Sequence, residues 1–307
     1  MRQSGTKVSL HRFCALFGVT RQAYYETEIS RAKTSIAHMI VLTLVKELRA
    51  EMPMLGCRKL LYLLKPEFSK HGIKMGRDAL FELLAFHGLL IRRRRRKVAK
   101  TTDSEHWLKK YPNLIIDITV TAPEQLWVSD ITYIRTLEGF SYLSLITDAY
   151  SRKIMGYALC PTLEAVGCME ALQMAIKQRT YKSNCKLIHH SDRGMQYCFF
   201  DYVGMLMKEN IAISMTQSGS PYENAMAERV NGIIKNDFFP KIIYQNHQQA
   251  QRAIQKIIKI YNENRPHLSL DYMTPDEAHE HNGEIKKRWK QYCKNNKKKE
   301  AIMNKDP

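Results

Sequence analysis

Residues 126–162 read LWVSDITYIRTLEGFSYLSLITDAYSRKIMGYALCPT, and this stretch decides the fold. It contains three runs rich in aromatic and β-branched side chains, which are typical of strands, at 126–136, 140–150 and 153–162. Short turns separate these runs, with Glu138 and Gly139 between the first two. Because short turns join antiparallel neighbours, the stretch predicts an antiparallel meander.

After the meander, helical and strand-like runs alternate. We expect helices at 163–179 and 197–210, strands at 185–190 and 211–216, and further helices at 221–239 and 247–264. Three hairpin strands followed by alternating elements predict an α/β fold, in which a mixed sheet is flanked by helices. This order is similar to that of the ribonuclease-H-like fold.

Before the meander, residues 1–90 are predicted to be helical. In 1–30, apolar residues at helical spacing are followed by Gly18 and by Thr20, which can cap a second helix. A second helical unit over 34–90 begins with an i, i+4 stripe at Ile36, Ile40, Leu44 and Leu48. The outline fits a helix-turn-helix-like DNA-binding region, and it equally fits a plain helical bundle.

The charge points to a polyanionic partner. The chain carries 48 Lys and Arg against 30 Asp and Glu, a net charge of +18. Nucleic acid is the commonest partner of so basic a protein, although a ribosome-associated or merely basic protein would have the same charge. An unbroken basic run stays extended unless it lies on phosphates. We therefore expect a DNA-contacting basic linker at 91–112 and a basic tail at 281–307, the linker run comprising Arg92, Arg93, Arg94, Arg95 and Arg96.

Other features exclude several protein classes. The seven cysteines are scattered without a C-x-x-C pair, which argues against a disulfide framework and a zinc ribbon. No run of 18 apolar residues occurs, so we expect no membrane span. The first residues do not resemble a signal peptide, and the expected location is the cytoplasm.

Three acids occupy positions that suggest a site. Asp130 interrupts a strand of otherwise apolar and aromatic residues, where Asp is disfavoured. Asp192 directly follows the expected strand 185–190, a usual place for a site residue in an α/β sheet. Each has a plainer interpretation, as a solvent-facing strand acid and as a turn residue.

Glu228 is the third acid, on a helix expected to begin near Pro221. Asn224, Glu228 and Lys235 fall along one face of that helix, with Asn231 close by. An ordinary solvated face would show the same pattern. Asp148, which also ends a strand, is a rival acid, although a turn role explains it equally well.

Together the three acids suit a metal site. Mg²⁺ or Mn²⁺ prefers hard oxygen ligands, and separate elements let such ligands converge. Two such ions can activate an attacking oxygen and stabilise the leaving 3′ oxygen of a phosphoryl displacement. Since metal lowers the pKa of bound water, no histidine base is required. His189 and His190 have no Cys or His partner at ligand spacing, so we interpret them as residues that pack or that support the site from behind its ligands, rather than as ligands.

The spacing of these acids carries a family resemblance. Asp192 and Glu228 are separated by 35 residues, which resembles the D,D(35)E signature of retroviral integrases and related transposases. The surrounding segments WVSDITYI, IHHSDRGMQY, QSGSPYENAMAERVNGIIK and YNENRPHLSLDYMTP resemble the OrfB transposases of the insertion-sequence family three. The similarity extends to CALFGVTRQAYYE near the N-terminus.

The resemblance implies a function and a set of roles. It implies an integrase catalytic core at 113–280 that cleaves DNA 3′ ends and transfers the strands, with Mg²⁺ or Mn²⁺, as two ions, held by Asp130, Asp192 and Glu228. It places Lys235 near DNA. Residues implied to support the site are Asn224, Arg229, Asn262, Arg265 and His267.

The resemblance also implies partners. These are DNA, as element ends and target, further copies of the chain on that DNA, and an upstream reading frame supplied separately or by fusion. The sequence has no long heptad pattern and begins at Met1, as expected for the downstream product alone. The implied location is the bacterial nucleoid. Two rivals are a regulator with an inactive core and a ribonuclease H or junction resolvase that hydrolyses without joining; the three acids and their spacing favour the transposase.

Overall fold

The computed structural model describes residues 9–91, 106–180, 186–217, 223–239, 242–281 and 283–286. The predicted arginine run 92–96 and most of the predicted tail lie outside these residues. The chain divides into two compact units, Met1–Arg95 and Arg96–Pro307. The finer boundaries predicted for linker, core and tail stay predictions.

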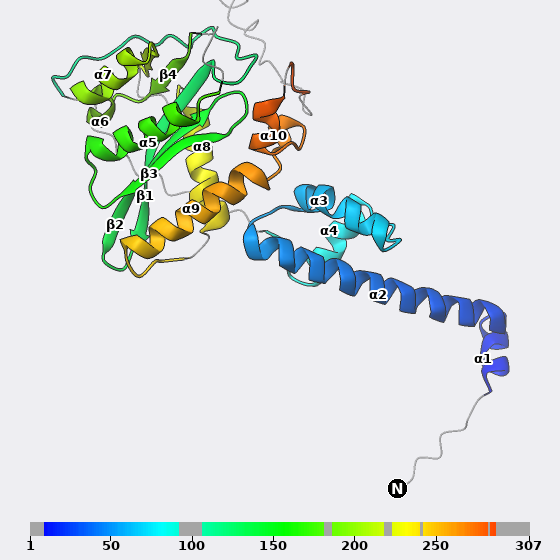
Figure 1. The fold of residues 1–307 in the computed structure, drawn as a ribbon. Coiled ribbons are helices and arrows are strands. Elements are labelled where there is room, and N and C mark those ends of the chain that lie inside the picture. The colour runs from blue at the N-terminus through cyan, green and yellow to red at the C-terminus, as the bar shows by residue number, and fades with distance from the viewer. Residues whose placement is uncertain are drawn as a thin grey trace, which may run out of the picture. The chain divides into compact units, whose positions relative to one another are not determined.

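The N-terminal unit is helical. It consists of α1 (Leu10–Leu16), α2 (Arg21–Glu51), α3 (Cys57–Lys70) and α4 (Arg77–Phe86). In Figure 1, α1 lies at the start of α2, and α3 and α4 lie beside the later part of α2. The centre of this unit is a set of leucines and valines, all buried, comprising Val41, Val45, Leu60, Leu64, Leu80 and Leu84.

One prediction for this unit is wrong. The hairpin expected over 1–30 and the unit expected from 34 onward are not separate, because α2 runs through both as one helix of 31 residues. No glycine or proline interrupts this segment, so nothing in it stops a helix. The predicted cap is present, since Thr20 Oγ1 accepts from Ala23 N at 3.1 Å. Gly18 forms the preceding turn at a φ of 63°.

The second unit contains the predicted mixed sheet. Its strands are β1 (Leu126–Thr136), β2 (Gly139–Asp148), β3 (Ile154–Cys160), β4 (Ile188–Ser191) and β5 (Ala212–Met215), in the order β3-β2-β1-β4-β5. The first three strands form the predicted antiparallel meander. The other two pair in parallel, β4 with β1 and β5 with β4.

Helices cover both faces of this sheet. They are α5 (Ala165–Gln178), α6 (Met195–Cys198), α7 (Phe200–Lys208), α8 (Ala225–Ile233), α9 (His247–Glu263) and α10 (Pro275–Glu280). Trp127 faces a core shared with α5, α6 and α7, and α5 crosses in front of the strands in Figure 1. Its neighbours Leu126 and Val128 point to the opposite face, where they pack with Ala227 of α8.

Helix α5 packs closely on the sheet, and α8 ends in an irregular turn. Helix α5 lies so close to β3 that a Cβ at Gly156 would be 2.0 Å from the Ala171 carbonyl oxygen. The helix expected over 221–239 begins at Ala225 and changes after Ile233 into a π-helical turn, Ile234–Phe238. Within the described part of the chain, no helix is long and apolar enough to span a bilayer.

Candidate active site

The register of two strands brings Asp130 and Asp192 to the same level. Strand β1 pairs in parallel with β4 so that Val128 lies opposite His190. Asp130 and Asp192 each follow these paired residues by two positions. Residues two apart in a strand point to the same face. Asp130 and Asp192 therefore lie at the same level, where the parallel pairing of β1 with β4 ends.

Helix α8 brings Glu228 to this face of the sheet. Asn224, at its start, donates from Nδ2 to the Ser129 carbonyl oxygen at 2.9 Å. Asn231 donates from Nδ2 to Asp130 Oδ2 at 2.8 Å. Glu228 lies on the helix between these two asparagines, and its side chain is exposed. The helix is thus attached to β1 on either side of Glu228.

The pKa of Asp130 reflects the nearby acids. This pKa is raised to about 7, first because burial disfavours the charged form and next because of the negative charge of Asp192. Glu228 raises this pKa further, whereas the hydrogen bonds from Asn231 and from Ile131 N lower it. Asp192 and Glu228 therefore both act electrostatically on Asp130, at the face where β1, β4 and α8 meet.

The Asp192 carboxylate is oriented by the turn after β4. Its Oδ1 accepts from Gly194 N at 3.0 Å. A Cβ at Gly194 would be 3.1 Å from that same oxygen, so a larger residue would press on the carboxylate. The turn interpretation and the site interpretation of Asp192 are thus compatible, because the turn holds the side chain in place.

The donor set suits a divalent cation. Carboxylates from two strands and a helix supply hard oxygen atoms, and their mutual repulsion would be relieved by positive charge. In the described ranges, no three acidic, histidine or cysteine side chains are grouped closely enough to form a metal-ligand cluster. The acids share one region of the sheet without forming a closed cage.

Lys235 is in a different setting from the one expected. Because it belongs to the π-helical turn, the 3.6-residue spacing that aligned it with Glu228 no longer applies. Its Nζ lies 3.3 Å from the centre of the Tyr133 ring of β1. Burial lowers the pKa of its ammonium group. A cation–π contact with β1 therefore holds this lysine.

The other predicted supporting residues make contacts elsewhere in the catalytic unit. Asn262 exchanges two hydrogen bonds with the backbone of Ile154, each of 3.0 Å. Arg265 is buried and donates to Asp237 Oδ2 at 2.6 Å. His267 is buried and packs edge-on against Tyr261. The exposed Arg229 acts electrostatically on Tyr261 as well.

Asp148, the rival acid, is a structural residue. It is fully buried, and its oxygens accept hydrogen bonds from the backbone N–H groups of Glu124, Tyr150 and Ser151 and from the Ser151 hydroxyl. These four hydrogen bonds, at 2.7–3.1 Å, show that the Asp148 carboxylate stabilises the turn between β2 and β3.

Removing this carboxylate should destabilise the protein. Asp148→Ala leaves buried N–H groups unpaired, and we expect a loss of about 3 kcal/mol in the free energy of unfolding. Urea denaturation measures this loss, with the exposed Asp117→Ala as the control. A variant of normal stability that has lost activity would instead place Asp148 in the chemistry.

His189 and His190 pack inside the unit, as interpreted from the sequence. Nε2 of His189 lies 2.8 Å from Ser129 Oγ and 2.9 Å from Tyr202 Oη. Burial lowers its pKa to about 3, so its ring is neutral. Nδ1 of His190 lies 2.8 Å from Ser214 Oγ.

The hydrogen bond between Asn231 and Asp130 was not predicted from the sequence. The position of Asn231 three residues after Glu228 was the only signal, and the contact with Asp130 depends on how α8 packs. We expect Asn231→Ala to lower DNA-joining activity about ten- to a hundredfold, as for other residues that orient a ligand. It should also raise the metal concentration needed for half-maximal activity. The neighbouring exposed Asn236→Ala is the control, and an unchanged metal requirement would argue against this role.

Comparison with known proteins decides the family. Integrase core domain models match residues 120–221 and 209–275. The insertion element IS600 31 kDa protein of Shigella sonnei is 35% identical over 267 residues, covering 85% of this chain and 95% of that protein. The chain belongs to the insertion-sequence transposases with an integrase core.

Two other transposases agree with this assignment. The IS629 transposase of Shigella sonnei is 30% identical over 68% of this chain and 69% of its own length. Transposase InsF of IS3A from Escherichia coli is 39% identical over 43% of this chain and 46% of its own length. The predicted family, insertion-sequence family three, is therefore confirmed, and the chain is a DDE-type polynucleotidyl transferase.

The fold prediction is confirmed as well. The integrase core family and the mixed sheet described above both correspond to the ribonuclease-H-like fold. Among solved structures, the catalytic core of HTLV-2 integrase is 18% identical, with a TM-score of 0.40, covering 52% of this transposase and 97% of that chain. Membership of the family implies that this transposase binds DNA and depends on divalent metal.

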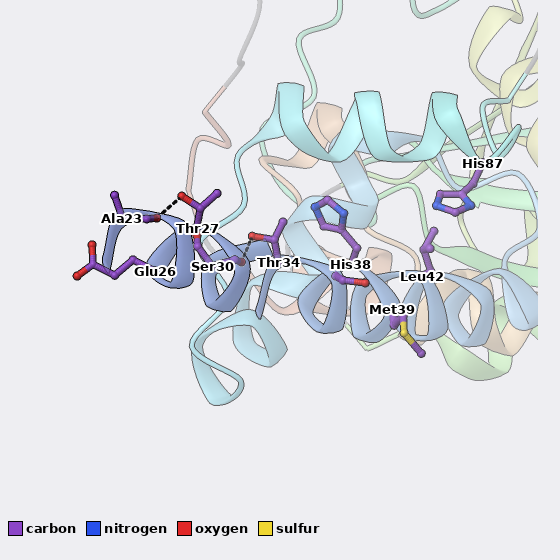
Figure 2. Close-up of a pocket in the computed structure, with 10 residues that line it drawn as sticks. Ala23, Glu26, Thr27, Ser30, Thr34, His38, Met39, Leu42 and His87 are labelled. Carbon is purple, nitrogen blue, oxygen red and sulfur yellow. Dashed lines mark hydrogen bonds between the residues drawn. The ribbon is translucent and has the colours of Figure 1, made fainter. Parts of the chain in front are cut away.

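A hollow elsewhere in the transposase does not belong to this site. It lies in the N-terminal unit along α2, and Figure 2 shows polar side chains together with Met39 and Leu42 in its lining, with His87 of the α4 end on one side. Its lining residues are Ala23, Glu26, Thr27, Ser30, Thr34, Ser35, His38, Met39, Leu42 and His87. None of the three acids contributes to it.

Proposed function

We propose that Asp130, Asp192 and Glu228 jointly hold two divalent ions, Mg²⁺ or Mn²⁺, and that this site both cleaves DNA 3′ ends and joins them to a target. The main support is the β1–β4 register, which puts Asp130 level with Asp192. The helix that bears Glu228 contacts Asp130 through Asn231. The raised pKa of Asp130 supports the proposal, because a partly buried carboxylate beside another acid favours a bound cation.

The residues around the acids have distinct tasks. When bound, the ions supply activation of the attacking oxygen and stabilisation of the leaving 3′ oxygen. Asn231 holds one Asp130 oxygen, and the Gly194 N–H orients Asp192. Cleavage and joining are both phosphoryl transfers, so the same carboxylates serve both steps in turn.

DNA is held by residues outside the acid cluster. We assign DNA contact to Lys235, beside Tyr133, and to the arginine run 92–96. The N-terminal helices, which carry α1 and its Gly18 turn before α2, are assigned to recognition of element ends. We assign supporting roles to Asn224, Arg229, Asn262, Arg265 and His267, as positioning residues that act through β1, β3 and α9. Binding through many phosphate contacts would weaken steeply as salt is raised.

The proposed partners follow from the reaction. Two element ends must be joined in one complex, which requires at least two copies of the chain on DNA. An upstream-frame protein, separate or fused, would contribute to recognition of the ends. The proposed location follows the DNA substrate, at the bacterial nucleoid.

Strand-transfer assays on DNA carrying the element's own ends would test the proposal. With Mg²⁺ or Mn²⁺, we expect joined products as well as cleaved ends. Metal-dependent nicking without joining would identify a nuclease instead. Specific DNA binding without any reaction, also in the presence of the upstream-frame protein, would identify a regulator.

A further inference from the structure

Helix α2 carries an exposed apolar seam with heptad spacing. Its members are spaced four, three, four and three residues apart, and they are Tyr25, Ile29, Ala32, Ile36 and Met39. The four large side chains are 51%, 56%, 59% and 66% exposed, in chain order. We call these five residues the α2 seam. An alternation of four and three is the 3.5-residue repeat of a coiled-coil interface.

This part of α2 has little to pack against within its own unit. Among the described side chains from Arg21 to Ile36, none is buried, whereas Val41 and Val45 further along are fully buried. In Figure 1 the helix runs well past α3 and α4 toward α1. Most of the stability of a helix in a protein comes from packing its apolar face. The exposed half therefore lacks the stabilisation that a partner would supply.

We propose that the α2 seam binds the same seam of a second copy of this chain, as a short parallel two-stranded coiled coil. This proposal deepens the self-association proposed above by naming its surface. In the heptad, Ile29 and Ile36 take the a positions, and Tyr25, Ala32 and Met39 take the d positions. β-branched residues at a favour two parallel strands.

The flanking charges select this partner and this orientation. In a parallel pair, each g residue faces the e residue five positions later on the other helix. Arg21 at g would face Glu26 of the second copy, and Glu28 at g would face Lys33. Both contacts join opposite charges, and two-fold symmetry repeats each of them. Such complementary e and g pairs determine the partner and the orientation of a coiled coil.

The other face of the same helix provides a matched control. Thr27 and Thr34 are exposed and are also seven residues apart; they line the hollow of Figure 2, to which Glu26 and Met39 also contribute. In the heptad they take the f positions, which point away from a partner helix. A charge placed there should leave the pairing intact.

Sedimentation equilibrium of the full chain, without DNA or metal, tests the proposal. We expect wild type and Thr27→Glu/Thr34→Glu to form dimers. Ile29→Glu/Ile36→Glu should weaken the dimer at least about a hundredfold, because like charges would meet in the seam. Circular dichroism and thermal unfolding at low protein concentration check that the variant monomers remain folded. A monomeric wild type, or equal dimerisation of both double variants, would overturn the proposal. Since no DNA step is involved, failure here leaves the proposed chemistry untouched.

A charge exchange tests the orientation. Glu28→Lys places lysine opposite Lys33 of the second copy, and we expect about tenfold weaker association from the two symmetric repulsions. Adding Lys33→Glu should restore wild-type affinity, because each pair is again of opposite charge. Association that is unaffected by the first change, or is not recovered by the second, would contradict the parallel pairing.

Discussion

Glu228→Gln is expected to lower strand transfer by at least about a thousandfold, which corresponds to about 4 kcal/mol of transition-state stabilisation. The substitution keeps the size of the side chain and removes its charge. Because the Glu228 side chain is exposed, its loss removes no core packing. DNA binding and thermal stability should therefore stay near wild type. Strand-transfer and DNA-binding assays on the same preparation separate the two effects.

A matched control is Glu209→Gln, an exposed glutamate that follows α7. It should transfer strands at the wild-type rate. Joining that survives in Glu228→Gln would sink the assignment of the third acid. Loss of DNA binding together with activity would show instead that Glu228 supports the fold or the DNA interface.

Asp130→Asn is expected to inactivate the transposase and, in metal-free buffer at pH 8, to stabilise it. The folded-state pKa of Asp130 is raised from 3.8 to about 7. Between these values the unfolded chain ionises while the folded chain keeps its proton, so stability falls as the pH rises. Above pH 7 both states are ionised and the loss is complete. Asparagine carries no charge, so the variant does not lose this stability as the pH rises.

The expected gain is up to about 4 kcal/mol at pH 8, from three pKa units at 1.36 kcal/mol each, and it should vanish near pH 4. Asparagine keeps one acceptor oxygen for the Asn231 bond, and loss of the Ile131 N bond costs about 1 kcal/mol of this gain. Thermal unfolding across this pH range measures the difference, with the exposed Asp117→Asn as the control.

Added metal should make the wild-type protein more stable than Asp130→Asn. Wild type should gain stability when Mn²⁺ is added at pH 8, because binding to the folded state alone shifts the equilibrium. Asp130→Asn should gain much less. Equal stabilisation of both proteins by Mn²⁺ would remove Asp130 from the ligand set, and a pH-independent stability difference would contradict the raised pKa.

Sequence reasoning placed the catalytic unit well because its signals are local. Alternation of apolar residues and the position of turns follow from the chemistry of neighbouring residues, so the meander 126–162 and its antiparallel pairing agree with β1, β2 and β3. The family followed from acids whose spacing is itself a property of the sequence. Thr20 as a helix cap is local in the same way.

Contacts between distant segments were not available to the sequence. The single helix α2 replaced two predicted units because the expected break between them had no glycine or proline to cause it. The π-helical turn moved Lys235 from the Glu228 face onto Tyr133, since a 3.6-residue period assumes a regular helix. Asp148 and Asp130 both lie in strands, and only burial and partners distinguish a structural carboxylate from one that meets two other acids.

The sequence by itself therefore determined the family and the strand order along the chain, and it predicted Asp130, Asp192 and Glu228 as the site acids. Tertiary structure alone decided that Asn231 holds Asp130, and that the α2 seam stays exposed while Val41 and Val45 are buried. The physical reason is the same in each case. Periodicity and spacing describe what a segment can form, whereas hydrogen bonding and burial depend on which distant segment packs against it.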